Sequence, residues 1–256
     1  MTKRFPRGAK ESRLMIFLGA LVVMLGCGAA QVKLNQGGGD YPWHTDIVAT
    51  TFWVGEVFDP QAEDGSQVYS TYDSQWQESY GGCDGVDTPA DCLTEQRFAE
   101  NGYFPQNMTP RENPFYLDLP YDDVNNPEAF AARADVIPWA KAQAGGNAAL
   151  FTDPNYSFMK NRWVMIKKGS RVCYGQIQDA GPGTYHDVEY VFGRHDARPA
   201  NTNFNGAGMD VSPALNGCLG FSELNGQNDR VDWKFVDEAD VPDGPWRRIV
   251  TTSQVR

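Results

Sequence analysis

The sequence has no apolar run long enough to cross a membrane. Its longest such run, residues 14–25, has 12 residues, whereas a membrane-spanning helix needs about 20. Five Lys and Arg residues and a single acid, Glu11, precede the run, and small residues follow it. This order is typical of a secretory signal. We therefore expect residues 1–30 to be a signal peptide and the protein to be exported, as a cell-envelope lipoprotein or a secreted protein.

Two cleavage sites fit the end of this signal. Residues 24–27 (MLGC) resemble a bacterial lipobox, in which Cys27 is lipidated, although Met24 replaces the usual Leu. Residues 28–30 (GAA) offer a small-x-small site that would leave Gln31 first. The cysteine count favours the lipobox, because lipidation of Cys27 leaves an even number to pair. A membrane contact is expected only through such a lipid.

Cysteine is otherwise scarce. The remaining four, Cys83, Cys92, Cys173 and Cys218, can pair in three ways, and an oxidising exterior makes disulfides stable. We predict the pairs Cys83–Cys92 and Cys173–Cys218, because each falls within one segment of the chain. Cys83 and Cys92 have no nearby His and fit a disulfide better than zinc. No metal and no cofactor are expected.

Basic residues are few after the signal. Residues 27–256 hold 17 Lys and Arg against 32 Asp and Glu, a net charge of −15. This charge argues against a nucleic-acid partner, which needs a basic face. It is compatible with a neutral polysaccharide. The three histidines, at positions 44, 186 and 195, lack the spacing of metal ligands and are expected on the surface or in loops.

Runs of helix-favouring residues are rare too, and no internal repeat is present, so the composition indicates a β-rich domain. Residues 31–46 are polar and glycine-rich and are predicted to be a flexible linker. Residues 47–58 are rich in β-branched and aromatic residues and are predicted to be the first strand. Residues 59–114 are irregular, and loops of this length are usually functional or independently stapled.

The second half has clearer local patterns. Residues 127–144 have a helical composition interrupted by Pro138. Strands are predicted at residues 163–166, 172–178 and 231–236 from their alternation. A short helix is predicted after Asp210, with the Ser212-Pro213 pair at its start.

Three segments occur in an informative order. They are residues 173–183 (CYGQIQDAGPG), 208–215 (GMDVSPAL) and 231–236 (VDWKFV). This order resembles the double-psi β-barrel superfamily, which includes expansins, rare lipoprotein A proteins, membrane-bound lytic transglycosylases of the A type and family 45 endoglucanases. Residues 51–55 (TFWVG) are similar to the "TxYG" first strand of expansins, and residues 82–85 (GCDG) to their "GACGYG" turn.

The resemblance implies a mainly β fold: a six-stranded double-psi β-barrel with long loop insertions and a few short helices, in one domain over residues 47–250. It also implies two catalytic residues. Asp210 matches the Asp of a "DLS" segment that serves as general acid in the endoglucanases. Asp179 matches the Asp of a "DRGP" turn in rare lipoprotein A proteins. The simpler alternatives are a helix N-terminal carboxylate for Asp210 and a turn residue for Asp179.

Two family positions differ in this chain. Tyr116 occupies the place of a His in rare lipoprotein A proteins, and the first-strand Asp of the endoglucanases has no counterpart, because Glu56 is displaced from it. The candidate sugar-binding aromatic residues are Trp53, Tyr72, Trp76, Tyr80 and Tyr116. For Trp53, a place in the core is the favoured alternative.

We therefore expect an exported protein that cleaves or loosens glycan chains, peptidoglycan or cellulose-like, as a glycosidase or lytic transglycosylase. Hydrolysis needs two carboxyl groups, whereas a transglycosylase of the resembling type manages with one. The alternatives are a non-catalytic, expansin-like carbohydrate-binding module and a structural envelope lipoprotein, since a fold alone does not set function.

Overall fold

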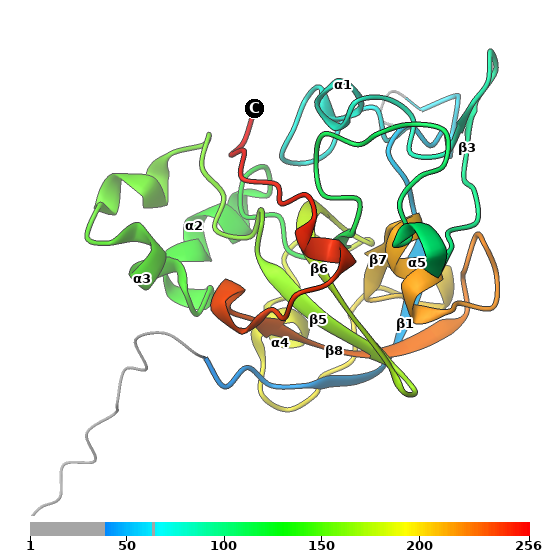
Figure 1. The fold of residues 1–256 in the computed structure, drawn as a ribbon. Coiled ribbons are helices and arrows are strands. Elements are labelled where there is room, and N and C mark those ends of the chain that lie inside the picture. The colour runs from blue at the N-terminus through cyan, green and yellow to red at the C-terminus, as the bar shows by residue number, and fades with distance from the viewer. Residues whose placement is uncertain (1–38, 63–64) are drawn as a thin grey trace, which may run out of the picture. The chain divides into compact units, whose positions relative to one another are not determined.

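Six strands close into a barrel in the order β1-β7-β4-β6-β5-β8 in the computed structural model, which describes residues 39–62 and 65–256 (Figure 1). The barrel strands are β1 (His44–Thr51), β4 (Tyr116–Leu119), β5 (Trp163–Lys168), β6 (Arg171–Ala180), β7 (Met209–Val211) and β8 (Asp229–Val236). A separate two-stranded sheet pairs β2 (Val86–Asp87) with β3 (Cys92–Leu93). The mainly β fold class and the closed six-stranded barrel are thus confirmed.

Strand pairing in the barrel is mixed. β1 runs parallel to β7, and β4 runs parallel to β6. The other four neighbouring pairs are antiparallel. Parallel neighbours cannot be joined by a tight turn, and long insertions accordingly separate the strands of both parallel pairs.

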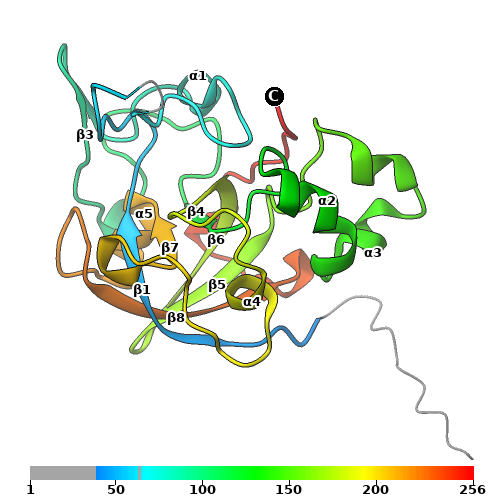
Figure 2. The same ribbon diagram turned by 180° about the vertical axis from the view of Figure 1, so that it is seen from behind.

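Short helices occur in the segments between the strands and after β8. The α-helices are α1 (Trp76–Tyr80), α2 (Pro127–Val136), α3 (Ala140–Ala144), α4 (Val188–Phe192) and α5 (Pro213–Leu219). The 3₁₀ helices are η1 (Ala99–Asn101), η2 (Ala148–Thr152), η3 (Phe204–Gly206), η4 (Glu238–Asp240) and η5 (Pro245–Arg247). Figures 1 and 2 show α2 and α3 at one side of the barrel and α1 with β3 at another. Among the described residues, no helix has the length and apolar composition to cross a membrane.

Local signals explain where the helices begin and end. The Asn126 side chain caps α2 by accepting hydrogen bonds from the N–H groups of Glu128 and Ala129. The helical stretch then breaks before α3 near Pro138, as the sequence predicted. Ser212 caps α5 by accepting from the N–H of Leu215 at 3.2 Å, and a left-handed glycine follows the helix.

The barrel core is filled by alternate residues of the strands. In β8, Val231, Trp233 and Phe235 point inward and are 2% exposed or less. Trp233 donates a hydrogen bond from its indole Nε1 to Tyr190 at 2.8 Å, which ties α4 to the barrel. The alternation predicted for this strand is therefore confirmed, and the strand begins two residues earlier than expected.

The ordered domain extends beyond residues 47–250 at both ends. Tyr41 accepts a hydrogen bond from Arg162 at 2.7 Å, and His44, in β1, is fully buried and stacks on Trp233 with ring centroids 4.1 Å apart. The prediction of a flexible linker is therefore wrong for residues 41–46, because this segment packs on the barrel. The prediction of a surface or loop position is wrong for His44, because its side chain is buried in β1. Thr251 is buried as well. Residues 31–38 of the expected linker, the signal peptide and Cys27 lie outside the described residues.

Both predicted disulfides are present. Cys83 bonds to Cys92 and closes the insertion that carries β2 and β3. Cys173 bonds to Cys218 and ties β6 to α5 across a sequence separation of 45. Closing loops of these lengths stabilises a fold by roughly 3–4 kcal/mol each in the chain-entropy picture. Two buried disulfides are typical of a protein from an oxidising compartment.

Candidate functional site

Three aspartates lie on three neighbouring strands at one place in the barrel. Asp118 in β4 is the register partner of Asp210 in β7 and of Asp179 in β6. The pairing of β4 with β6 slips by one residue between Leu117 and Asp118. Because a β-bulge changes the direction of the side chains that follow it, this slip is what places Asp179 opposite Asp118.

Asp118 is the innermost of the three. Its side chain is 4% exposed, and its Oδ1 accepts a hydrogen bond from the backbone N–H of Asp210 at 2.9 Å. Gly181 packs against the same carboxyl group, where a Cβ would lie 2.8 Å from Asp118 Oδ2. Burial, followed by the charges of Asp210 and Asp179, raises the pKa of Asp118 well above its usual range. This environment therefore favours the protonated, neutral form of Asp118.

Asp179 is also buried, but its charge is better solvated by the backbone. Its Oδ1 accepts hydrogen bonds from the N–H groups of Thr71 and Ala180, both at 2.8 Å. Burial raises the pKa of Asp179 to about 6, and these N–H groups oppose the rise. Asp179 thus ionises below neutral pH while holding the loop that carries Thr71.

Asp210 is the member of this cluster with access to solvent, since its residue is only partly buried. Its Oδ1 is buried and has no hydrogen-bond partner among the described residues. Burial and then the charge of Asp179 raise the pKa of Asp210 to about 7. The Asp210 carboxyl group, on a residue that is partly exposed, thus keeps a proton to near neutral pH.

A fourth carboxyl group lies within electrostatic range. Glu56 follows the first strand and is partly buried. Burial raises its pKa to about 8, the charges of Asp210 and Asp91 add to the rise, and a hydrogen bond from the Trp53 backbone opposes it. The charge of Asp210 thus acts on Glu56, the displaced acid of the sequence motif.

Three carboxyl groups of this cluster have pKa values raised toward neutral pH: about 6 for Asp179, about 7 for Asp210 and about 8 for Glu56. A carboxyl group in this range can keep a proton near neutral pH, which is what a general acid needs. Over residues 39–62 and 65–256, no group of three or more His, Cys, Asp or Glu side chains is arranged to hold a metal ion.

The five aromatic residues predicted to bind sugar are buried in the fold. Trp53, Tyr72, Trp76, Tyr80 and Tyr116 are each 6% exposed or less. Trp76 packs edge-on against Tyr116, and Trp53 donates from its indole to the carbonyl of Cys92 at 2.8 Å. The core alternative for Trp53 is confirmed. None of the five rings is exposed enough to stack on a sugar, so they are not part of the proposed site.

Asp84 is the reason that Tyr80 and Tyr116 point inward. The two tyrosine hydroxyls donate to its two carboxylate oxygens, each at 2.7 Å. Arg97 adds an ion pair at 2.9 Å, with both side chains fully buried. Tyr116 also accepts from the N–H of Val54 at 3.0 Å. This network, which we call the Asp84 network, joins the disulfide-closed insertion to β4 and to the end of the first strand.

No family model matches the chain, and no curated protein or solved structure matches it either.

The sequence pointed to Asp210 and Asp179, and the structure brings these two together. Sequence reasoning did not identify Asp118 or the electrostatic link of Glu56 to Asp210. A usable signal for Asp118 was present, because an acid between two strand leucines, Leu117 and Leu119, requires a special environment if both faces are buried.

Proposed function

We propose that the protein is an exported, polysaccharide-active protein that cleaves or loosens glycan chains, with Asp210 as the general acid. The observation that carries this proposal is the solvent access of Asp210 combined with its proton-holding environment beside Asp118 and Asp179. A group that protonates a glycosidic oxygen needs a pKa near the working pH. The two disulfides support the exported location.

The strand order supports the finer fold assignment as well. We propose that the barrel is of the double-psi type, with the pairs β1–β7 and β4–β6 as its two parallel contacts. In this arrangement the segments around Asp179 and Asp210 have the places that the resemblance implies for them.

Single-carboxyl chemistry is the better supported route. Hydrolysis needs a second carboxylate as base or nucleophile, but Glu56 keeps its proton to about pH 8 and Asp179 is buried and bound to two backbone N–H groups. In the proposed reaction, Asp210 gives its proton to the bridging oxygen and the glycosidic bond breaks. A hydroxyl of the same sugar then attacks the anomeric carbon and returns its proton to Asp210, leaving an anhydro end.

A non-catalytic, expansin-like role is the second candidate. It is favoured by Tyr116, which replaces the His of rare lipoprotein A proteins. Tyr116 is fully buried and its hydroxyl is bound to Asp84, so it does not reach a glycan. Such a protein would bind and loosen the polymer without releasing products.

A digest of several polymers separates these candidates. Peptidoglycan and cellulose are incubated with the protein and with Asp210→Asn, and soluble products are examined for anhydro ends. We expect release by the unmodified protein, loss of release in Asp210→Asn, and unchanged polymer pull-down. Asp135→Asn, an exposed aspartate on α2, is the matched control. Binding without release would favour the expansin-like role, and absence of both would favour a structural lipoprotein.

The mature N-terminus is tested separately. Mass analysis of the exported protein is expected to show a lipidated Cys27, with membrane attachment through that lipid. A mature chain that starts at Gln31 would identify a fully secreted protein instead.

A further inference from the structure

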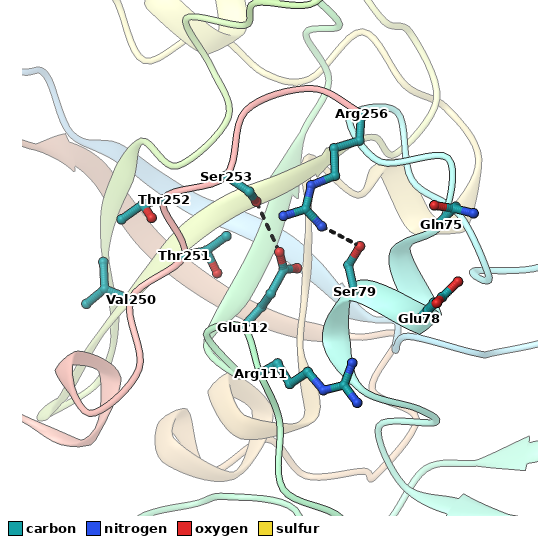
Figure 3. A pocket seen from close by; sticks show the side chains of 10 residues that line it. All are labelled: Gln75, Glu78, Ser79, Arg111, Glu112, Val250, Thr251, Thr252, Ser253 and Arg256. Carbon is teal, nitrogen blue, oxygen red and sulfur yellow. Dashed lines mark hydrogen bonds between the residues drawn. The ribbon is translucent and has the colours of Figure 1, made fainter.

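A pocket of about 460 Å³ lies between helix α1 and the C-terminal segment (Figure 3). Its lining residues come from α1, from the chain just before β4 and from the C-terminal segment; they are Gln75, Glu78, Ser79, Arg111, Glu112, Val250, Thr251, Thr252, Ser253 and Arg256. Its volume lies within the range of small-molecule sites. Asp118, Asp179 and Asp210 do not line it, so this pocket is distinct from the carboxyl cluster.

Glu112 forms the floor of the pocket and has unused hydrogen-bonding capacity. The residue is 7% exposed, and its Oε1 accepts from the Ser253 hydroxyl at 3.1 Å. Its Oε2 is buried and has no hydrogen-bond partner among the described residues. Figure 3 shows this carboxylate directed between the C-terminal segment and α1. A buried acceptor left unpaired is destabilising, so a ligand that donates a hydrogen bond to Oε2 would relieve part of that cost.

A buried cation near Glu112, Lys160, does not satisfy this acceptor. Lys160 is 3% exposed, and its Nζ makes only long hydrogen bonds, at 3.4 Å to Ser253 and 3.3 Å to the Gln254 carbonyl. Burial lowers the pKa of Lys160 and raises that of Glu112. No ion pair joins the two side chains in the described part of the chain. Lys160 offsets the charge of Glu112 at a distance without occupying its Oε2.

The rim of the pocket carries both signs of charge. Arg111 and Arg256 contribute two guanidinium groups, and Glu78 together with Glu112 contributes two carboxyl groups. Arg256 donates to the Ser79 hydroxyl at 2.9 Å (Figure 3). The lining is therefore close to neutral and favours neither an anion nor a cation, while it presents hydroxyl, guanidinium and carboxyl groups side by side.

A sugar hydroxyl matches this lining, because it donates one hydrogen bond and accepts others. We propose that this pocket binds a neutral saccharide, one or two sugar rings in size, with Glu112 Oε2 accepting from a sugar hydroxyl and Arg111 donating to a neighbouring one. The site is independent of the chemistry proposed for Asp210. It would hold a part of the glycan, or a released product, away from the carboxyl cluster.

The test is a titration of the full chain by NMR with cellobiose and with N,N′-diacetylchitobiose. We expect saturable shifts at pocket residues with at least one of the two sugars. Arg111→Ala should weaken binding about fivefold, the equivalent of one hydrogen bond. Arg111 is exposed, so this change leaves the fold intact. Arg194→Ala, another exposed arginine, should bind as the unmodified protein does.

Two further samples make the outcome decisive. Glu112→Gln should abolish the shifts if it folds, and Asp210→Asn should leave them unchanged, which separates this site from the proposed catalytic one. The proposal is overturned if neither sugar shifts the pocket residues, or if Arg111→Ala and Arg194→Ala bind alike. It is also overturned if a zwitterion such as glycylglycine shifts these residues and the sugars do not.

Discussion

At the residue scale, the general-acid role proposed for Asp210 depends on its contact with Asp118. Asp118 contributes an acceptor for the Asp210 N–H and a buried side chain that fills the space beside it. Asp118→Asn preserves both, whereas Asp118→Ala removes the acceptor and admits water to Asp210. We expect the pKa of Asp210, followed by carboxyl-carbon NMR, to stay near its original value in the Asn variant and to fall by about one unit or more in the Ala variant, because hydration favours the ionised form.

Equal behaviour of the two variants would contradict this role for Asp118. If both lower the pKa of Asp210, then the proton of Asp118 itself matters. If neither does, the hydrogen bond does not position Asp210.

The same carboxyl groups make stability depend on pH. Burial raises the pKa values of Asp118, Asp179 and Asp210, so the folded state binds more protons than the unfolded chain above about pH 4. Stability therefore falls as pH rises from about 4 through the raised pKa values. Asp118→Asn removes one contributor, so its free energy of unfolding relative to that of the unmodified protein should increase from pH 4 to pH 8, which chemical denaturation at several pH values measures. A stability difference between the two proteins that stays constant from pH 4 to pH 8 would contradict this contribution of Asp118.

Sequence reasoning at this scale succeeded where residue type and local motif decide the outcome. Asp210 precedes a Ser-Pro helix start and Asp179 precedes a Gly-Pro turn, so both were recognisable. The aromatic residues were not assignable in the same way, since Tyr80 and Tyr116 owe their burial to Asp84. A buried tyrosine and a sugar-stacking tyrosine have the same local sequence until the partner is known.

At the scale of elements, the Asp84 network holds the disulfide-closed insertion against the barrel. Asp84→Asn leaves the fully buried Arg97 without its counter-charge, and breaking a buried pair in this way costs about 3–5 kcal/mol. Chemical denaturation should show this loss. The surface pair Lys141–Asp135, in which both side chains are well exposed, is the control, and Asp135→Asn should change stability little.

A double-variant cycle with Arg97→Met tests the interpretation. The double variant Asp84→Asn/Arg97→Met should recover part of the loss, because neither charge then remains buried alone. Additive losses would mean that the two side chains act separately.

Elements with strong local signals were predictable, and those fixed by barrel closure were not. Helices α2 and α5 carry capping residues, and the β5–β6 hairpin was predicted from two strand-like segments around a turn, although β6 is buried at every residue from Cys173 to Ala180. β7 has only three residues and pairs with β1 and β4, which are distant in sequence. β1 begins at His44, whose side chain stacks on Trp233 and is buried. The local sequence does not predict this contact, because Trp233 is distant in sequence.

At the scale of the whole molecule, the barrel places acids from three strands at one point, and the two disulfides tie the insertion and α5 to it. The net charge of −15 over residues 27–256 fits a neutral polymer, which binds by hydrogen bonds, better than a polyanion. The closed barrel was predictable from the order of three motifs. The position of Asp118 was not, because it depends on the register slip between β4 and β6.

The pH dependence of saccharide release tests the central claim most directly. Release from peptidoglycan or cellulose is measured from pH 5 to pH 9 with the unmodified protein and with Asp210→Asn. Because the pKa of Asp210 is about 7, we expect release to fall as pH rises through that value, and to be absent in Asp210→Asn at every pH. Release that increases above pH 7, or that persists in Asp210→Asn, would contradict the role of Asp210 as the general acid.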